Sequence, residues 1–203
     1  MKRTFPLTIL ALVIALLSPL AATSQVAPTR RAATTNDEGE PIYKYKIYAG
    51  YGYTSLNQVN QSRYGLQGVE ATLTRDFGKY FALAADGGYY KPPIAGGNPG
   101  DPLVDVVLFG PEFHAPIYGH YSGFFRGLIG GEHTGGEGMT PNISFAGGIG
   151  GGIEYSLRGR LAVRASGDDI ASSFSLNNNT PLLAYSPHEH WNARASIGVV
   201  YKF

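Results

Sequence analysis

The chain has 203 residues, the size of one domain with short additions. Its formal net charge of +1 gives no electrostatic basis for binding nucleic acid, and the absence of cysteine excludes disulfides and thiolate metal sites. Glycine contributes 28 residues, tyrosine 14 and phenylalanine 10. This composition is typical of a tightly curved sheet, because the aromatic content argues against disorder.

The first 24 residues have the parts of a secretory signal peptide. Lys2 and Arg3 give a basic start, an apolar run extends from Leu7 to Leu17, and small residues follow up to Ser24. An N-terminal membrane anchor is the alternative, but the run is shorter than the roughly 20 residues that a spanning helix needs. We therefore expect cleavage after Ser24, export, and a flexible periplasmic leader over residues 25–41.

From residue 42 the chain alternates apolar and polar side chains with a period of two, which predicts β-strands. The alternation is interrupted by clusters of Gly, Pro and polar residues that predict turns and loops. Eight strand segments are expected, at about residues 42–54, 69–74, 81–89, 107–113, 125–132, 144–155, 161–168 and 191–203.

The predicted connections alternate between long and short. Long ones are expected at residues 57–63, 91–102, 133–142 and 170–190, and short ones around 78–79, 116–119 and 158–160. Short turns on one side and long loops on the other are typical of bacterial outer-membrane barrels. Pro111 interrupts a predicted strand and removes a hydrogen-bond donor, so we expect a bulge or local irregularity there.

The last segment, Trp191 to Phe203, has an apolar odd face with an aromatic residue at each end. Its close, with Val199, Tyr201 and Phe203 on one face, resembles the last strand of the Gram-negative outer-membrane β-barrels. The eight-segment pattern is similar to the eight-stranded type, typified by the outer membrane protein A transmembrane domain. The resemblance implies that these three residues form the C-terminal assembly signal read by the barrel-assembly machinery.

The resemblance also implies the fold and the location. Residues 42–203 are expected to form an all-β, eight-stranded antiparallel up-and-down transmembrane β-barrel, a porin-like membrane protein of the cell outer membrane with both termini in the periplasm. Its surroundings would be the outer-membrane lipid bilayer and lipopolysaccharide. A soluble lipocalin-like barrel is the structural alternative, with its apolar face turned inward around a ligand.

Charged residues of both signs fall on the predicted inward face. Such charges are costly inside a small barrel unless they are paired, and an arginine can hold two carboxylate oxygens at once. We expect a lumen plugged by salt bridges, since eight strands enclose a space that side chains roughly fill. The predicted network consists of Glu70, Asp86, Glu112, Arg126, Glu154, Arg164 and Arg194.

The remaining candidate sites have simpler interpretations. His188 and His190, which flank Glu189, lack the rigidly placed third ligand of a zinc site and are expected to be solvated loop residues. His114 and His120 are expected at the membrane interface on either side of a turn. The glycine-dense run 147–152 is not followed by a helix, so it does not form a phosphate-binding loop. We expect no metal and no cofactor.

The sequence favours a structural or interaction role through extracellular loops, without catalysis. A lipid A-modifying outer-membrane enzyme and a narrow pore are the alternatives. An enzyme would need a surface nucleophile with a base, and the available pairs are His133 with Glu132 and His190 with Ser186. Neither spacing is specific for catalysis. The ligand of the loops does not follow from the sequence, and no nucleic-acid partner is expected.

Overall fold

The computed structural model describes residues 43–56, 64–93, 102–136, 141–157, 159–172 and 191–203. Within these ranges, no helix is long and apolar enough to cross a membrane. The predicted signal peptide (1–24) and leader (25–41) lie outside the described residues.

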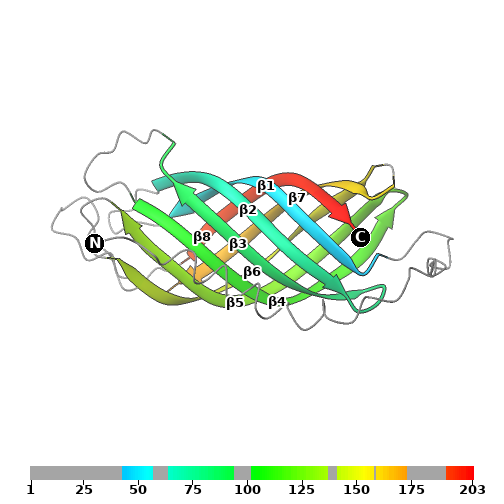
Figure 1. Cartoon of the computed structure of the whole chain (residues 1–203), viewed down its shortest axis with the longest axis horizontal. Helices are drawn as coiled ribbons and strands as arrows, with labels where there is room; N and C mark the ends of the chain where they lie inside the picture. Colours follow the sequence, from blue (N-terminus) through cyan, green and yellow to red (C-terminus); the bar gives the residue numbers. More distant parts are fainter. Residues whose placement is uncertain (1–42, 57–63, 94–101, 137–140, 158, 173–190) are drawn as a thin grey trace, which may run out of the picture. The chain divides into compact units, whose positions relative to one another are not determined.

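The described residues form eight strands that close into one barrel, each antiparallel to its neighbours and in sequence order (Figure 1). The ring is closed by β1 and β8, which pair from Lys46–Lys202 to Ser55–Ala193. This confirms the predicted fold class. The strands are β1 (Tyr45–Leu56), β2 (Tyr64–Asp76), β3 (Phe81–Lys91), β4 (Pro102–Tyr118), β5 (Tyr121–Gly136), β6 (Asn142–Ser156), β7 (Leu161–Ser172) and β8 (Trp191–Lys202).

Three connections are short turns, at residues 77–80, 119–120 and 157–160. Gly119 and Gly159 have φ angles of 55° and 70° in two of these turns, a conformation that residues with a Cβ rarely adopt. The turns lie at the same end of the barrel as the C-terminus (Figure 1). We call this the short-turn end, and the opposite end, where β1 finishes and β2 begins, the far end.

Several strands are longer than the sequence predicted; β2 has 13 residues and β4 has 17, where about six and seven were expected. β5 continues to Gly136 and β7 to Ser172, so the connections expected to begin at His133 and Ile170 start too early. The polar residues that suggested loops are strand residues. Thr134, for example, is fully buried inside the barrel. A polar inward face is normal in a membrane barrel, so polarity does not mark the end of a strand.

The register of β4 shifts near Pro116, not at Pro111. Phe109 pairs with Ile129 and Glu112 with Arg126, so the offset between β4 and β5 is the same on both sides of Pro111. The shift falls between Pro116 and Tyr118, next to the 119–120 turn. No bulge that shifts the register therefore lies at Pro111, but the pairing of β4 with β5 is interrupted there, between Phe109 and Glu112, which is the expected local irregularity.

One alternation runs through the whole barrel. The buried side chains of the eight strands are all even-numbered, and the large exposed apolar side chains on the strands are odd-numbered, apart from Tyr118 beside the register shift. Even positions thus face the lumen and odd positions face outward. Phe145, Val69 and Ile149 are more than half exposed on the outer wall.

This distribution is the inverse of a soluble barrel. The outer wall is a continuous apolar surface, and buried charged side chains occupy the interior. A lipocalin-like barrel would place its apolar face inward, so that alternative is wrong. An apolar exterior over a closed sheet, which satisfies every backbone group internally, is the arrangement that a bilayer requires.

Phe203 takes part in closing the barrel. Tyr45 N–H donates to Phe203 O at 3.0 Å, Phe203 N–H donates to Tyr45 O at 2.8 Å, and the two rings stack with centroids 5.7 Å apart. Replacing Phe203 with Asp removes one interfacial aromatic ring, a loss of about 2 kcal/mol at most. We expect the variant to refold in detergent but to reach the surface of cells in much lower amounts, measured by heat-modifiable gel mobility of outer-membrane fractions.

Phe113→Asp is the matched control for this prediction. Phe113 is also an outward aromatic residue of the short-turn half, 51% exposed against 46% for Phe203, but it lies within β4. Equal losses for the two variants, or normal surface levels for Phe203→Asp, would contradict a specific assembly role of the C-terminal residue.

Candidate functional site in the barrel lumen

The structure places all seven predicted lumen residues inside the barrel. None is more than 3% exposed, and every one takes part in an ion pair. They form two groups, a central network around Arg126 and Arg194 and a second cluster around Arg164 towards the short-turn end.

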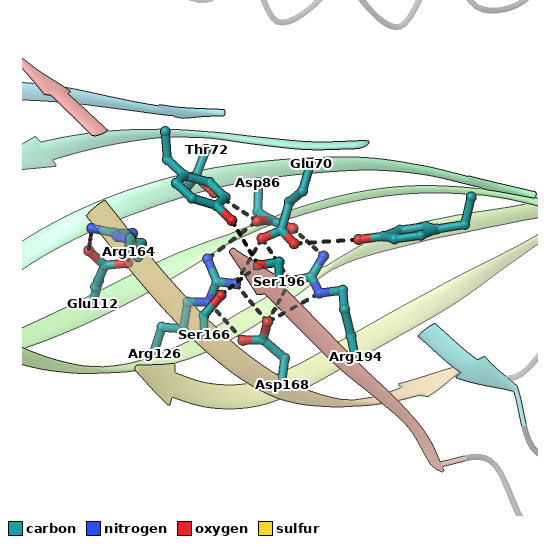
Figure 2. Close-up of polar contacts among 12 residues, drawn as sticks. Glu70, Thr72, Asp86, Glu112, Arg126, Arg164, Ser166, Asp168, Arg194 and Ser196 are labelled. Carbon is teal, nitrogen blue, oxygen red and sulfur yellow. Dashed lines mark hydrogen bonds and ion pairs between the residues drawn. The ribbon is translucent and has the colours of Figure 1, made fainter. Parts of the chain in front are cut away.

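Asp168 on β7 is the centre of the first group (Figure 2). Arg126 on β5 holds it with two parallel bonds, from Nε to Oδ1 at 2.8 Å and from Nη2 to Oδ2 at 2.7 Å. Arg194 on β8 donates to the same Oδ2 from Nε at 3.1 Å and from Nη2 at 2.9 Å. Such forked contacts fix the position of a guanidinium as well as its charge.

Asp86 on β3 bridges the two arginines on the opposite side. It accepts from Arg194 Nη1 at 2.7 Å and from Arg126 Nη1 at 3.3 Å. A third bond comes from Thr72 Oγ1 at 2.9 Å. Figure 2 shows the two guanidinium groups lying between Asp168 and the carboxylates of Asp86 and Glu70.

Glu70 on β2 completes the network with longer contacts. It accepts from Arg126 Nη2 at 3.2 Å and lies 3.7 Å from Arg194 Nη2. Tyr90 Oη donates to its other oxygen at 3.4 Å. Two guanidinium groups therefore face three carboxylates, and hydroxyl donors supply the remaining hydrogen bonds. The five charged residues come from five strands and meet across the lumen.

Arg164 on β7 organises the second group. Its Nη2 lies 3.1 Å from Glu154 and 3.4 Å from Glu112. Its guanidinium carbon also sits 4.3 Å from the centroid of the Phe124 ring, a cation–π distance. Lys202 binds the second oxygen of Glu154 at 2.7 Å. Arginine is suited to this position because its planar group can stack and pair at the same time.

Small inward residues make room for these side chains. A methyl group on Gly150 would overlap Asp168 Oδ1, and one on Gly50 would overlap the Tyr48 hydroxyl. Beside the central network, apolar side chains fill the lumen, including Leu108, Leu128 and Ile170. The described part of the lumen is therefore a packed interior.

Several lumen residues were missed or misplaced by the sequence analysis. Asp168 was absent from the predicted network although it accepts hydrogen bonds from both central arginines. Its even number could have assigned it to the inward face of its strand. Lys46 and Asp76 also pair inside the barrel, at 3.0 Å. His114, expected at the membrane interface, points inward, and its Nε2 lies 3.1 Å from Glu112 Oε1.

His133 and Glu132, the pair that an enzyme would have had to use, are not brought together. The two residues are adjacent on β5, so their side chains point to opposite faces, with Glu132 buried and His133 on the outer wall. His133 Nδ1 instead lies 3.2 Å from Asp105 on β4. The other candidates, Ser186, His188, Glu189 and His190, lie outside the described residues. Within the described residues, no group of three metal-binding side chains occurs.

Comparisons with known proteins establish the fold. No protein-family model and no curated protein matches the chain. Neisserial surface protein A matches over 79% of this chain and 97% of its own, with a TM-score of 0.61 and 13% identity. The chain has the fold of the small outer-membrane β-barrels. Ail, the attachment invasion locus protein of Yersinia pestis, covers 80% of this chain and 100% of its own, with a TM-score of 0.51 and 13% identity.

A third match points the same way. The N-terminal β-barrel domain of Pseudomonas aeruginosa OprF covers 79% of this chain and 98% of its own, with a TM-score of 0.51 and 13% identity. Within this outer-membrane fold, the predicted assembly residues Val199, Tyr201 and Phe203 lie on the outer wall and are 50%, 43% and 46% exposed. Recognition of these residues by the assembly machinery stays a prediction.

The contacts of Arg194 predict a large effect of its removal. Arg194→Leu leaves Asp86 and Asp168 buried with too few positive partners, which typically costs about 3–5 kcal/mol at a dry site. We expect a clearly lower urea midpoint for unfolding in detergent.

Lys79→Leu is the control for the Arg194 experiment, because it removes the same charge from an exposed turn. Its effect should stay within about 0.5 kcal/mol. An Arg194→Leu barrel with the wild-type midpoint would show that the lumen network does not hold the barrel together.

Proposed function

We propose that the chain is a closed, non-catalytic barrel of the outer membrane that acts through its surface-exposed connections. The observation that carries this proposal is the central network, in which Arg126 and Arg194 link Glu70, Asp86 and Asp168 from five strands across the lumen. A barrel filled in this way offers no continuous water path at that level. Its function then lies on its outer surfaces.

We infer the orientation of the barrel in the membrane from the lengths of its connections. Small outer-membrane barrels have short periplasmic turns and longer extracellular loops. The short-turn end with Phe203 would therefore face the periplasm, and the segments 57–63, 94–101, 137–140 and 173–190 would face outward. Bilayer lipid and lipopolysaccharide would surround the apolar wall, and the barrel-assembly machinery would be a partner during insertion.

The absence of catalysis is also part of the proposal. His133 and Asp105 form the one histidine–carboxylate pair on the outer wall of the described strands. Their outward cross-strand neighbours are Tyr89 and Ile143, so no serine, threonine or cysteine is placed next to the pair as a nucleophile. This arrangement supports a binding or structural role over lipid modification.

A surface-binding role is compatible with the fold. Ail has been solved in complex with the heparin analogue sucrose octasulfate, so a barrel of this shape can present a ligand-binding surface. For this chain, the loop ligand would be determined by its own outward segments.

Conductance tests the closed lumen. We expect purified wild-type protein in planar bilayers to show no large, steady ohmic current, because the central side chains occupy the lumen. Asp168→Ala combined with Arg194→Ala removes one charge of each sign and two long side chains, and it should raise conductance. Large steady currents from the wild type would overturn the closed-barrel proposal.

Cysteine labelling tests the orientation of the barrel. The chain has no native cysteine, so every signal comes from the introduced residue. Single cysteines at Asn98 and Asn178 should react with an impermeant thiol reagent on intact cells, because we place these segments outside. Cysteines at Lys79 and Gly159, in the short turns, should react only after lysis. Labelling of Gly159→Cys on intact cells would invert the proposed orientation.

A further inference from the structure

Glu132 on β5 differs from the other buried carboxylates. Glu70, Asp86, Glu112, Glu154 and Asp168 all form ion pairs with arginine or lysine. Glu132 is 3% exposed, yet among the described residues it has no cationic partner within ion-pair distance. Its Oε1 accepts a hydrogen bond from Ser172 Oγ on β7 at 3.1 Å. A buried carboxylate without a counter-charge is strongly unfavourable.

Among the described residues, neither Arg126 nor Arg194 lies within ion-pair distance of Glu132. Arg126 donates to Asp168, Asp86 and Glu70, and Arg194 donates to Asp168 and Asp86. On the inward face of β5, Leu128 of the buried apolar cluster and Gly130 lie between Arg126 and Glu132. On β7, Ile170 of the same cluster lies between Asp168 and Ser172. Leu128 and Ile170 thus lie between Glu132 and the central network on these two strands, while the inward residue beside Arg194 on β8 is the buried Asn192.

Hydroxyl oxygens accompany Glu132 at this level. Thr134, two residues further along the same face of β5, is 0% exposed, and its Oγ1 has no hydrogen-bond partner within the part of the chain that the structure describes. Ser172 is 2% exposed. Ser144 on the neighbouring strand donates to the Glu132 carbonyl oxygen at 3.5 Å. The unpartnered Thr134 hydroxyl is an observation independent of the unpaired charge, and both are satisfied by the same kind of ligand.

We propose that Glu132, Thr134 and Ser172 form a binding site for a small hard monovalent cation of the size of Na⁺. Hard cations prefer carboxylate and hydroxyl oxygens over nitrogen or sulfur. One carboxylate among neutral hydroxyls gives the site a single negative charge, which matches a monovalent ion. Bound there, the ion neutralises Glu132 and accepts the free lone pairs of Thr134. The proposal does not depend on what the outward segments bind.

Thermal unfolding of the full-length mature barrel in detergent tests the site. The midpoint is measured in NaCl and in N-methyl-D-glucamine chloride at the same pH and ionic strength, so that screening is constant. An ion at ten times its Kd raises the ratio of folded to unfolded protein about elevenfold. We expect a saturable rise of about 3–6 °C in Na⁺. Equal midpoints in the two salts would overturn the proposal.

Variants assign the effect to the site. Glu132→Gln should abolish the Na⁺ shift, whereas Asp105→Asn, which removes a carboxylate from the outer wall of the adjacent strand, should keep it. Thr134→Val should shrink the Na⁺ shift without lowering the midpoint in N-methyl-D-glucamine, because it removes a hydroxyl that has no partner. A full shift in Glu132→Gln would place the ion elsewhere. A larger shift with CaCl₂ than with NaCl would overturn the monovalent assignment.

Discussion

The structure depends on the closure of backbone hydrogen bonding around the ring. In a bilayer no water is available to satisfy a free N–H or C=O, so a sheet must pair its first strand with its last. Here β1 and β8 pair over ten residue positions, from Lys46–Lys202 to Ser55–Ala193, and the bonds between Tyr45 and Phe203 extend the closure to the last residue. Closure fixes the register, and the register assigns each side chain to the lumen or to the lipid.

The size of the ring then determines what the lumen can contain. Eight strands leave an interior that side chains fill, so the inward face must combine long polar groups with residues small enough to admit them. Gly150 beside Asp168 and Gly50 beside Tyr48 are such positions. Charges enclosed in this way must pair, and Arg126 and Arg194 do so with forks that reach carboxylates on three other strands. The small inward glycines and the paired arginines are both consequences of the narrow interior that eight strands enclose.

The sequence predicted what depends on local alternation and not what depends on register. A period of two is visible in a single segment, so all eight strands, the short turns and the inward position of seven charged residues followed from it. The partners did not follow, because Arg194 and Asp86 are 108 residues apart and meet only when the barrel closes. The even number of Asp168 placed it on the inward face, but its role as the shared acceptor of two arginines depends on that closure. The ends of β5 and β7 were missed because lumen-facing polar residues look like loop residues in a sequence.

The charged side chains of the lumen differ in their access to water along its length. Lys46, Asp76, His114 and Lys202, near the short-turn end, have side chains 12–15% exposed, whereas those of the central network are at most 4% exposed. Ion pairs that water reaches approach the surface value of about 1 kcal/mol or less, while breaking a dry pair costs several times more. The dry residues, which are the central five together with Arg164, Glu112 and Glu154, therefore bear most of the electrostatic stability of the interior, and the central five also form the barrier across it. Stability and closure of the lumen are consequently one property of this barrel, and a substitution that opens the centre must also weaken the fold.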